Sequence, residues 1–122
     1  MALAKEIMVG GFSAGAAKAI NGQVQSAVTA AGTVITDATD LTASINVITT
    51  CAAGAGVQLP SCEVGDTVSI LNLGASACKV YPDISTGQIN QLSAGTAMTL
   101  ATNTAVTLER FTTLRWMAWL SA

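Results

Sequence analysis

The segment VGDTVSILNLGASACKVYPD, residues 64–83, contains two short runs of alternating apolar and polar side chains separated by a turn. In the first run Val68 and Ile70 alternate with hydroxyl side chains, which is the period of a β-strand with one buried face. Gly74 lies in the break between the runs. Pro82 ends the second run, because proline cannot donate to a sheet ladder. The segment therefore predicts a β-hairpin.

The period of two continues over most of the chain from about Thr33 onward. Leu41, Ala43, Ile45 and Val47 are expected to share one buried face. Short strands separated by turn signals about every eight to twelve residues are typical of antiparallel sandwiches and small barrels. We therefore predict an all-β domain over residues 33–122, either an antiparallel β-sandwich or a jelly-roll-like small barrel. Its other expected strands are 57–59, 67–73 with a bulge or strand end at 71–73, 78–81, 88–92, 97–101, 105–110 and 114–120.

Residues 1–32 are predicted to form an extended N-terminal arm with little regular structure. Alanine, glycine, serine and glutamine dominate this segment, and its glycines argue against one continuous helix. Short helical turns are expected at 16–20 and 23–31, because apolar residues recur there at a spacing of four. With so little apolar bulk the arm cannot hold a shape alone. We expect it to become ordered on another subunit, the alternative being a frayed tail.

The composition of the chain indicates a surface that is poorly solvated on its own. Charged residues make up only 10% of the 122 residues, against roughly 25% in an ordinary soluble domain. A single folded domain of this mass exposes on the order of 6,000 Å². Five basic and seven acidic residues are too few to solvate such a surface well. Because 51% of the residues are hydrophobic, we expect other protein to cover much of it.

Charge and hydropathy exclude two classes of partner. The net charge is −2 and no Lys/Arg cluster occurs, which argues against nucleic-acid binding. No stretch reaches the ~20 uninterrupted apolar residues that cross a bilayer, so no membrane partner is expected. The apolar run at 7–17 is a poor secretory signal, because Glu6 precedes it and glycines interrupt it.

The three cysteines, Cys51, Cys62 and Cys78, form no CxxC pair. An odd number leaves one thiol over after any intrachain disulfide, which favours a reducing place of synthesis. We expect all three to be reduced and buried, with a Cys51–Cys62 disulfide as the alternative. No metal site or other cofactor is expected, because the chain has no histidine and no close pair of ligands.

Catalytic motifs are largely missing from the sequence, so we do not expect an enzyme. Without histidine there is no Ser-His-Asp or Cys-His arrangement. Two carboxylate pairs, Asp37 with Asp40 and Glu63 with Asp66, are the candidates for glycan cleavage. Both pairs lie in turn-like contexts, where acidic side chains usually cap backbone amides and remain solvated. The glycines at 52–56 lack the spacing of a phosphate-binding loop.

The final predicted strand, LRWMAWL at residues 114–120, is apolar on both faces. Trp116 and Ala118 lie on one face, and Met117 and Trp119 lie on the other. One face can enter the core. The other needs a partner, and tryptophan is enriched at the centres of protein interfaces. The alternative is a strand that lies wholly inside the sandwich.

Six segments of the chain together carry a family resemblance. They are LTASIN at 41–46, GVQLP at 56–60, GDTVSILNLG at 65–74, VYP at 80–82, GQINQL at 87–92 and Trp116. This succession resembles a β module common in tailed-phage virion proteins, and the match covers roughly three quarters of the chain. Proteins with this module include capsid decoration (cement) proteins, head fibres and tail-fibre tips, and they commonly act as homotrimers.

The resemblance implies a structural protein of the phage head surface, made in the host cytoplasm. Because the module has only a short lead segment, we expect a decoration protein that binds the major capsid protein and stabilises contacts within the shell. The alternative is a host-attachment tip whose exposed loops, 52–56 and 82–87, carry the contacts. The side chains expected at the subunit or capsid interface are Ile7, Met8, Phe12, Ile20, Trp116, Trp119 and Leu120.

Overall fold

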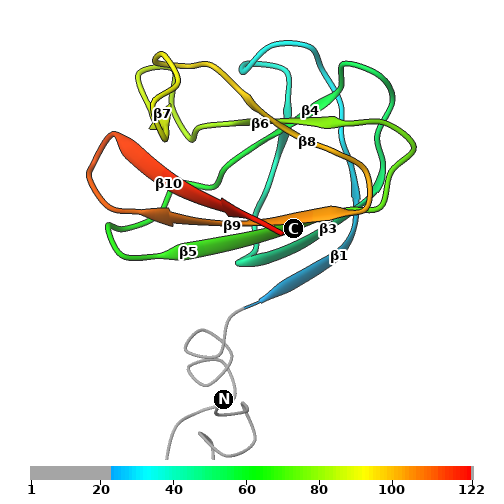
Figure 1. The fold of residues 1–122 in the computed structure, drawn as a ribbon, viewed down its shortest axis with the longest axis horizontal. Helices are drawn as coiled ribbons and strands as arrows, with labels where there is room; N and C mark the ends of the chain where they lie inside the picture. The colour runs from blue at the N-terminus through cyan, green and yellow to red at the C-terminus, as the bar shows by residue number, and fades with distance from the viewer. Residues whose placement is uncertain (1–22, 122) are drawn as a thin grey trace, which may run out of the picture.

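The computed structural model describes residues 23–121, which form ten β-strands and no helix (Figure 1). The expected all-β class is confirmed. Within this range no helix is therefore long and apolar enough to span a membrane. The strands are β1 (Val24–Thr29), β2 (Thr39–Asp40), β3 (Ile45–Thr50), β4 (Gly56–Gln58), β5 (Thr67–Asn72), β6 (Cys78–Tyr81), β7 (Gln88–Ile89), β8 (Met98–Leu100), β9 (Thr104–Arg110) and β10 (Arg115–Leu120).

The strands form two sheets that lie one above the other in Figure 1. The six-stranded sheet has the order β1-β3-β5-β9-β10-β7, and the four-stranded sheet has the order β2-β4-β6-β8. From β1 to β8, successive strands alternate between the two sheets. Side chains from both sheets meet in one apolar core, in which Ile48, Val80 and Trp116 are fully buried.

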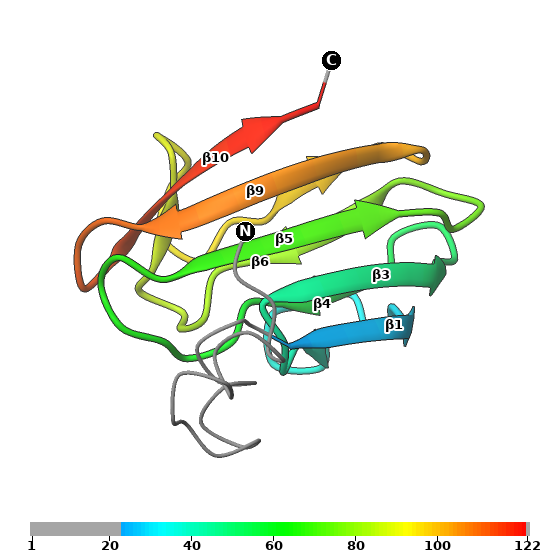
Figure 2. The same ribbon diagram turned by 90° about the horizontal axis from the view of Figure 1, so that it is seen from below.

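Residues 24–81 wind in the manner of a short β-solenoid. Because successive strands alternate between the sheets, each strand from β3 to β6 lies beside the strand two before it and runs parallel to it. The last strands close the fold in the opposite sense: β8 pairs antiparallel with β6, β9 with β5, and β10 with β9 (Figure 2). The expectation of antiparallel neighbours is therefore wrong for the first six strands and for β7, which pairs parallel with β10, and it holds for these three closing pairs.

The hairpin predicted over residues 64–83 does not form, because β5 and β6 belong to different sheets. Val68 and Ile70 of β5 are buried in the core from one sheet, and Cys78 and Val80 of β6 are buried in it from the other. A hairpin and an arch between two sheets bury the same alternate residues. The pattern therefore identified the buried faces correctly and left the pairing undetermined.

Asn72 fixes the arch between β5 and β6. Its side chain is fully buried, and its Nδ2 donates to the backbone oxygens of Ser76 and Leu100, each at 3.0 Å. Its Oδ1 accepts from the amide of Gly74 at 2.9 Å. Gly74 is required there, because a Cβ at this position would lie 2.8 Å from the Cβ of Cys51. The irregularity expected at 71–73 is thus a strand end, since β5 stops at Asn72.

The predicted strand at 41–47 is wrong in its phase. Leu41 and Ala43 are buried as expected, but β3 begins only at Ile45, and Ile45 is 44% exposed. Asn46 faces the core instead, and its Nδ2 donates to the carbonyl of Ala43 at 2.8 Å. The chain therefore bends between the sheets at residues 42–44, and this bend inverts the alternation.

Within residues 23–31 the chain forms strand β1, Val24–Thr29, rather than the expected helical turn. β1 runs parallel to β3, with register shifts between Gln25 and Thr29. This bulge lets Val24 lie opposite the outward-facing Ile45, while Val28 lies opposite the buried Ile48. The spacing of four that suggested a helix therefore spans a bulge, and β1 belongs to the sheet although it precedes the predicted boundary at residue 32. The rest of the predicted arm, residues 1–22, lies outside the described residues.

Candidate functional site

The structure separates the residues predicted to form an interface. Trp116 is fully buried in the core, so it is unavailable to a partner, contrary to expectation. Trp119 is 52% exposed and Leu120 is 59% exposed. Ile7, Met8, Phe12 and Ile20 lie outside the described residues. Of the predicted set, only the end of β10 therefore presents side chains to a partner in the part of the chain that is described.

The six-stranded sheet carries an apolar outer face that ends at Trp119. Strand register places one row of residues straight across five strands, namely Val24, Ile45, Ser69, Thr107 and Trp119. The neighbouring row contains Val47, Leu71 and Ala105. Neither row includes a charged residue. We refer to these eight residues as the neutral face.

The charges of the outer face lie at one end, beside an open hollow. Glu109 pairs with Met117 in the strand register, and Arg115 lies two residues before Met117 on the same side of β10. The hollow has a volume of about 560 Å³ and is lined by Asn90, Gln91, Phe111, Arg115 and Met117. The guanidinium of Arg115 donates to Oε1 of Gln88 at 2.7 Å. This end of the face is therefore polar and recessed.

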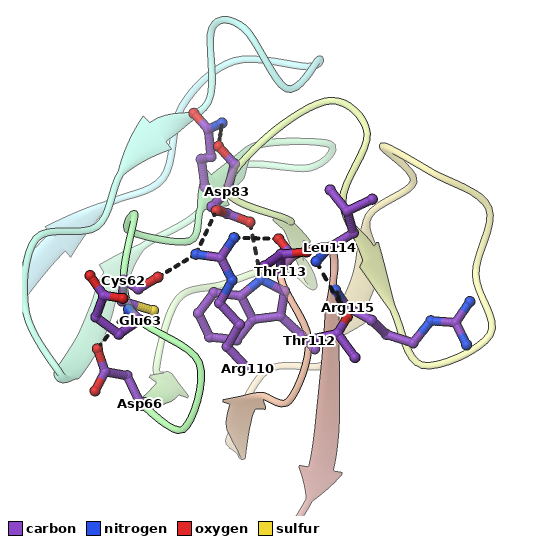
Figure 3. Close-up of polar contacts among 11 residues, drawn as sticks. Cys62, Glu63, Asp66, Asp83, Arg110, Thr112, Thr113, Leu114 and Arg115 are labelled. Carbon is purple, nitrogen blue, oxygen red and sulfur yellow. Dashed lines mark hydrogen bonds and ion pairs between the residues drawn. The ribbon is translucent and has the colours of Figure 1, made fainter.

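A buried polar cluster around Asp83 ties together segments that are distant in sequence (Figure 3). Oδ2 of Asp83 lies 3.5 Å from Nη1 of Arg110, and the two side chains are 4% and 12% exposed. Oδ1 of Asp83 accepts from the indole N–H of Trp116 at 3.1 Å. The guanidinium also donates to the carbonyls of Cys62 and Thr113. Asp83 thereby joins the end of β6 to β9, β10 and the loop before β5.

Most polar groups of this cluster bond one another, although Nε of Arg110 is buried without a partner among the described residues. Both carboxylate oxygens of Asp83 are occupied, and its backbone carbonyl accepts from Nε2 of Gln58 at 2.9 Å. The nearby Cys62 thiol is held in its protonated form, because burial, followed by the charge of Asp66, raises its pKa above the ordinary value. The arrangement fits a structural tie rather than a centre for bond making.

One member of each carboxylate pair caps a turn. Oδ1 of Asp37 accepts from the amides of Thr33 and Val34 at 3.0 and 2.9 Å. Oδ2 of Asp66 accepts from the amide of Glu63 at 2.9 Å. All four carboxylates of the two pairs belong to exposed residues. The capping interpretation of these turns is confirmed for Asp37 and Asp66.

The fold brings Cys51 close to Cys78 rather than to Cys62. The Cys51 thiol donates to the carbonyl of Ala77 at 3.6 Å, and it also contacts the Cys78 thiol. Cys51 and Cys78 are buried, Cys62 is half-buried, and all three are free thiols. Among residues 23–121, no cluster of three or more potential ligands could hold a metal ion.

We expect the protein to lose stability above pH 9 through Cys78. Burial, then the adjacent Cys51, raises the pKa of the Cys78 thiol from 9.0 to about 12. Below pH 9 both folded and unfolded chains keep this proton. Between pH 9 and 12 only the unfolded chain releases it, so the free energy of unfolding falls by up to about 1.4 kcal/mol per pH unit.

Urea denaturation from pH 8 to 11 measures this slope, and Cys78→Ala should reduce it. Lys79→Ala provides a control, because this half-buried neighbour lies outside the core cluster and its side chain bonds Thr99. An equal slope in Cys78→Ala and the parent protein would contradict the assignment.

Sequence reasoning identified Trp119 and missed most of the neutral face. The signal was present in β3, where Ile45, Val47 and Ile48 make both faces apolar, as in β10. The Asp83 cluster left no local signal, because Arg110 and Trp116 follow Asp83 by 27 and 33 residues. Comparisons of the chain with protein-family models, with curated proteins and with solved structures found no match.

Proposed function

We propose that this protein is a capsid decoration (cement) protein of a tailed phage. It acts as a homotrimer on the outer surface of the head, after synthesis in the host cytoplasm. There it binds the major capsid protein and stabilises contacts between capsid subunits. The role is mechanical and needs no cofactor, nucleic acid or membrane.

The observation that carries this proposal is the neutral face in a chain of which only 10% of the residues are charged. Val24, Ile45 and Trp119 are 63%, 44% and 52% exposed on the outer side of one sheet. Exposed apolar side chains that gather on one face commonly mark a site of association. The resemblance to phage virion modules suggests that the surface covering this face is the capsid shell of a tailed phage. The polar cluster at Asp83 supports the same role, because it locks the body into one rigid shape.

We further infer that the two sheets work as one small β-sandwich. The support is that the side chains of both sheets join a single buried cluster. A jelly roll is a poorer description, because jelly rolls are built from antiparallel neighbours, whereas five strand pairs here are parallel.

A host-attachment tip is the second candidate, and the hollow beside β10 favours it. Phe111, Asn90 and Gln91 offer an aromatic side chain and amides in an open depression of about 560 Å³, a combination that suits small polar ligands. Residues 84–86 of the 82–87 loop are also exposed.

Binding to phage heads that lack the protein separates the two roles. We expect the purified full-length chain to bind such heads saturably over their whole surface and to raise the temperature at which they rupture. Immunogold labelling of complete virions locates the bound protein. Labelling confined to the tail tip would favour attachment instead, and binding to neither structure would refute both roles. Bovine serum albumin at equal concentration controls for adsorption.

A further inference from the structure

The six-stranded sheet has two incomplete ends, and each carries at least one exposed apolar side chain. At one end β1 pairs only with β3 among the described strands. At the other end β7 covers only Arg115 and Trp116 of β10. The last four residues of β10 therefore have no neighbouring strand on that side within residues 23–121. Val24, Trp119 and Leu120 at these ends are each more than half exposed. Exposed apolar strand edges of this kind invite pairing or packing with another chain.

The polar groups in the middle of the neutral face can already bond each other, so a partner can cover them at low cost. Ser69 and Thr107 are its only polar side chains, and their hydroxyls lie 3.3 Å apart, within hydrogen-bonding distance of each other. A hydroxyl that is already bonded can be covered without the full cost of desolvating an unpaired polar group. Ala105 adds a small side chain beside them, which allows close approach. The face can therefore be covered without new polar partners.

Because the neutral face carries no charge, it favours an uncharged partner surface. A strongly acidic or basic partner would find no complementary group on either row. A second neutral face meets no such penalty. The two ends also differ in shape, since Trp119 and Leu120 present bulk while Val24 and Ile45 present shorter aliphatic side chains. These ends therefore complement each other better than either complements itself.

We propose that the β10 end of one copy packs head-to-tail against the β1–β3 end of a second copy, with Trp119 and Leu120 against Val24 and Ile45. A head-to-tail contact uses two different patches, so it closes into a ring when the rotation permits. A ring covers both incomplete ends in every copy, whereas a two-fold contact through one end leaves the other open. That the ring contains three copies depends on the proposed function, in which the protein is a homotrimer.

Cross-linking between two full-length single variants, I45C and W119C, tests this contact directly. Both carry Cys62→Ala to remove the half-buried thiol. After mixing, exchange and oxidation with copper phenanthroline, we expect a covalent dimer in the mixture and little in either variant alone. The double variant I45C/W119C should give covalent species of up to three chains. Val34→Cys mixed with W119C is the matched control, because Val34 is 50% exposed in a turn before the four-stranded sheet.

Charge insertion gives a second readout that does not depend on disulfide geometry. W119K should reduce the mass measured by light scattering from about three chains to one, with an unchanged β-type circular dichroism spectrum. Val34→Lys adds the same charge at a similarly exposed site and should leave the mass unchanged. Efficient W119C self-cross-linking without a mixed product would overturn the head-to-tail contact in favour of a two-fold one.

A parent protein that is a monomer would also overturn the contact. Protection of Trp119 from acrylamide in that monomer would assign the face to residues 1–22 of the same chain. These measurements use the isolated protein, so they are distinguishable from failure of the proposed function. If the protein forms the ring but does not bind phage heads, the decoration function alone is refuted. If it binds heads as a monomer, the ring alone is refuted.

Discussion

Replacing Asp83 by asparagine is expected to lower the free energy of unfolding by about 3–5 kcal/mol. The change keeps the size of the side chain but removes the charge opposite Arg110, whose side chain is only 12% exposed. The guanidinium then remains buried without a counter-charge. Urea denaturation followed by tryptophan fluorescence measures the loss, and it should also report the site directly because Trp116 bonds Asp83.

The matched control for this prediction is Asp40→Asn, which removes a carboxylate from an exposed position at the end of β2. It should change stability by no more than about 0.5 kcal/mol. Adding Arg110→Met to the Asp83→Asn variant should recover part of the loss, because the unpaired charge is then removed as well. A cost below about 1 kcal/mol for Asp83→Asn would mean that water solvates the guanidinium.

Trp116→Ala is expected to cost about 3–5 kcal/mol. The indole is fully buried in the core and donates to Asp83, so the change leaves a cavity and also removes a hydrogen bond from the carboxylate. Because small domains are stable by only about 5–15 kcal/mol, the variant should be largely unfolded at moderate temperature. Thermal melting followed by circular dichroism measures this.

Leu73→Ala is the control for Trp116→Ala, because Leu73 is an apolar residue that is 51% exposed in the β5–β6 arch. It should melt within a few degrees of the parent protein, since surface substitutions usually cost under about 0.5 kcal/mol. Equal melting temperatures for Trp116→Ala and Leu73→Ala would contradict the placement of Trp116 in the core.

The sequence predicted burial better than it predicted pairing. Val68, Ile70, Cys78 and Val80 face the core as the alternation indicated. The partner of each strand was not predictable from that alternation, because a side chain points inward whether its strand pairs with the next segment or with one two segments away. Turn residues were equally ambiguous, since glycine suits both a hairpin turn and the arch at Gly74.

The candidate site was also predicted only in part. The two-sided pattern of residues 114–120 correctly placed Trp119 outside, but it also assigned Trp116 to an interface. Which face enters the core depends on the position of β10 between β9 and β7, and no local pattern encodes that position. The bend at 42–44 likewise depends on the buried amide of Asn46, which the alternation assigned to the polar side.

The pairing of β5 with β9 has a consequence for synthesis. These strands are neighbours in the sheet, yet β9 begins at Thr104, long after β5 ends at Asn72. In a nascent chain that has not reached residue 104, β1, β3 and β5 of the six-stranded sheet can be paired, but the other edge of β5 has no partner. Unpaired edges promote association with other chains. Translation that stalls before this point should therefore yield insoluble fragments, whereas in the completed chain β9 covers the edge of β5.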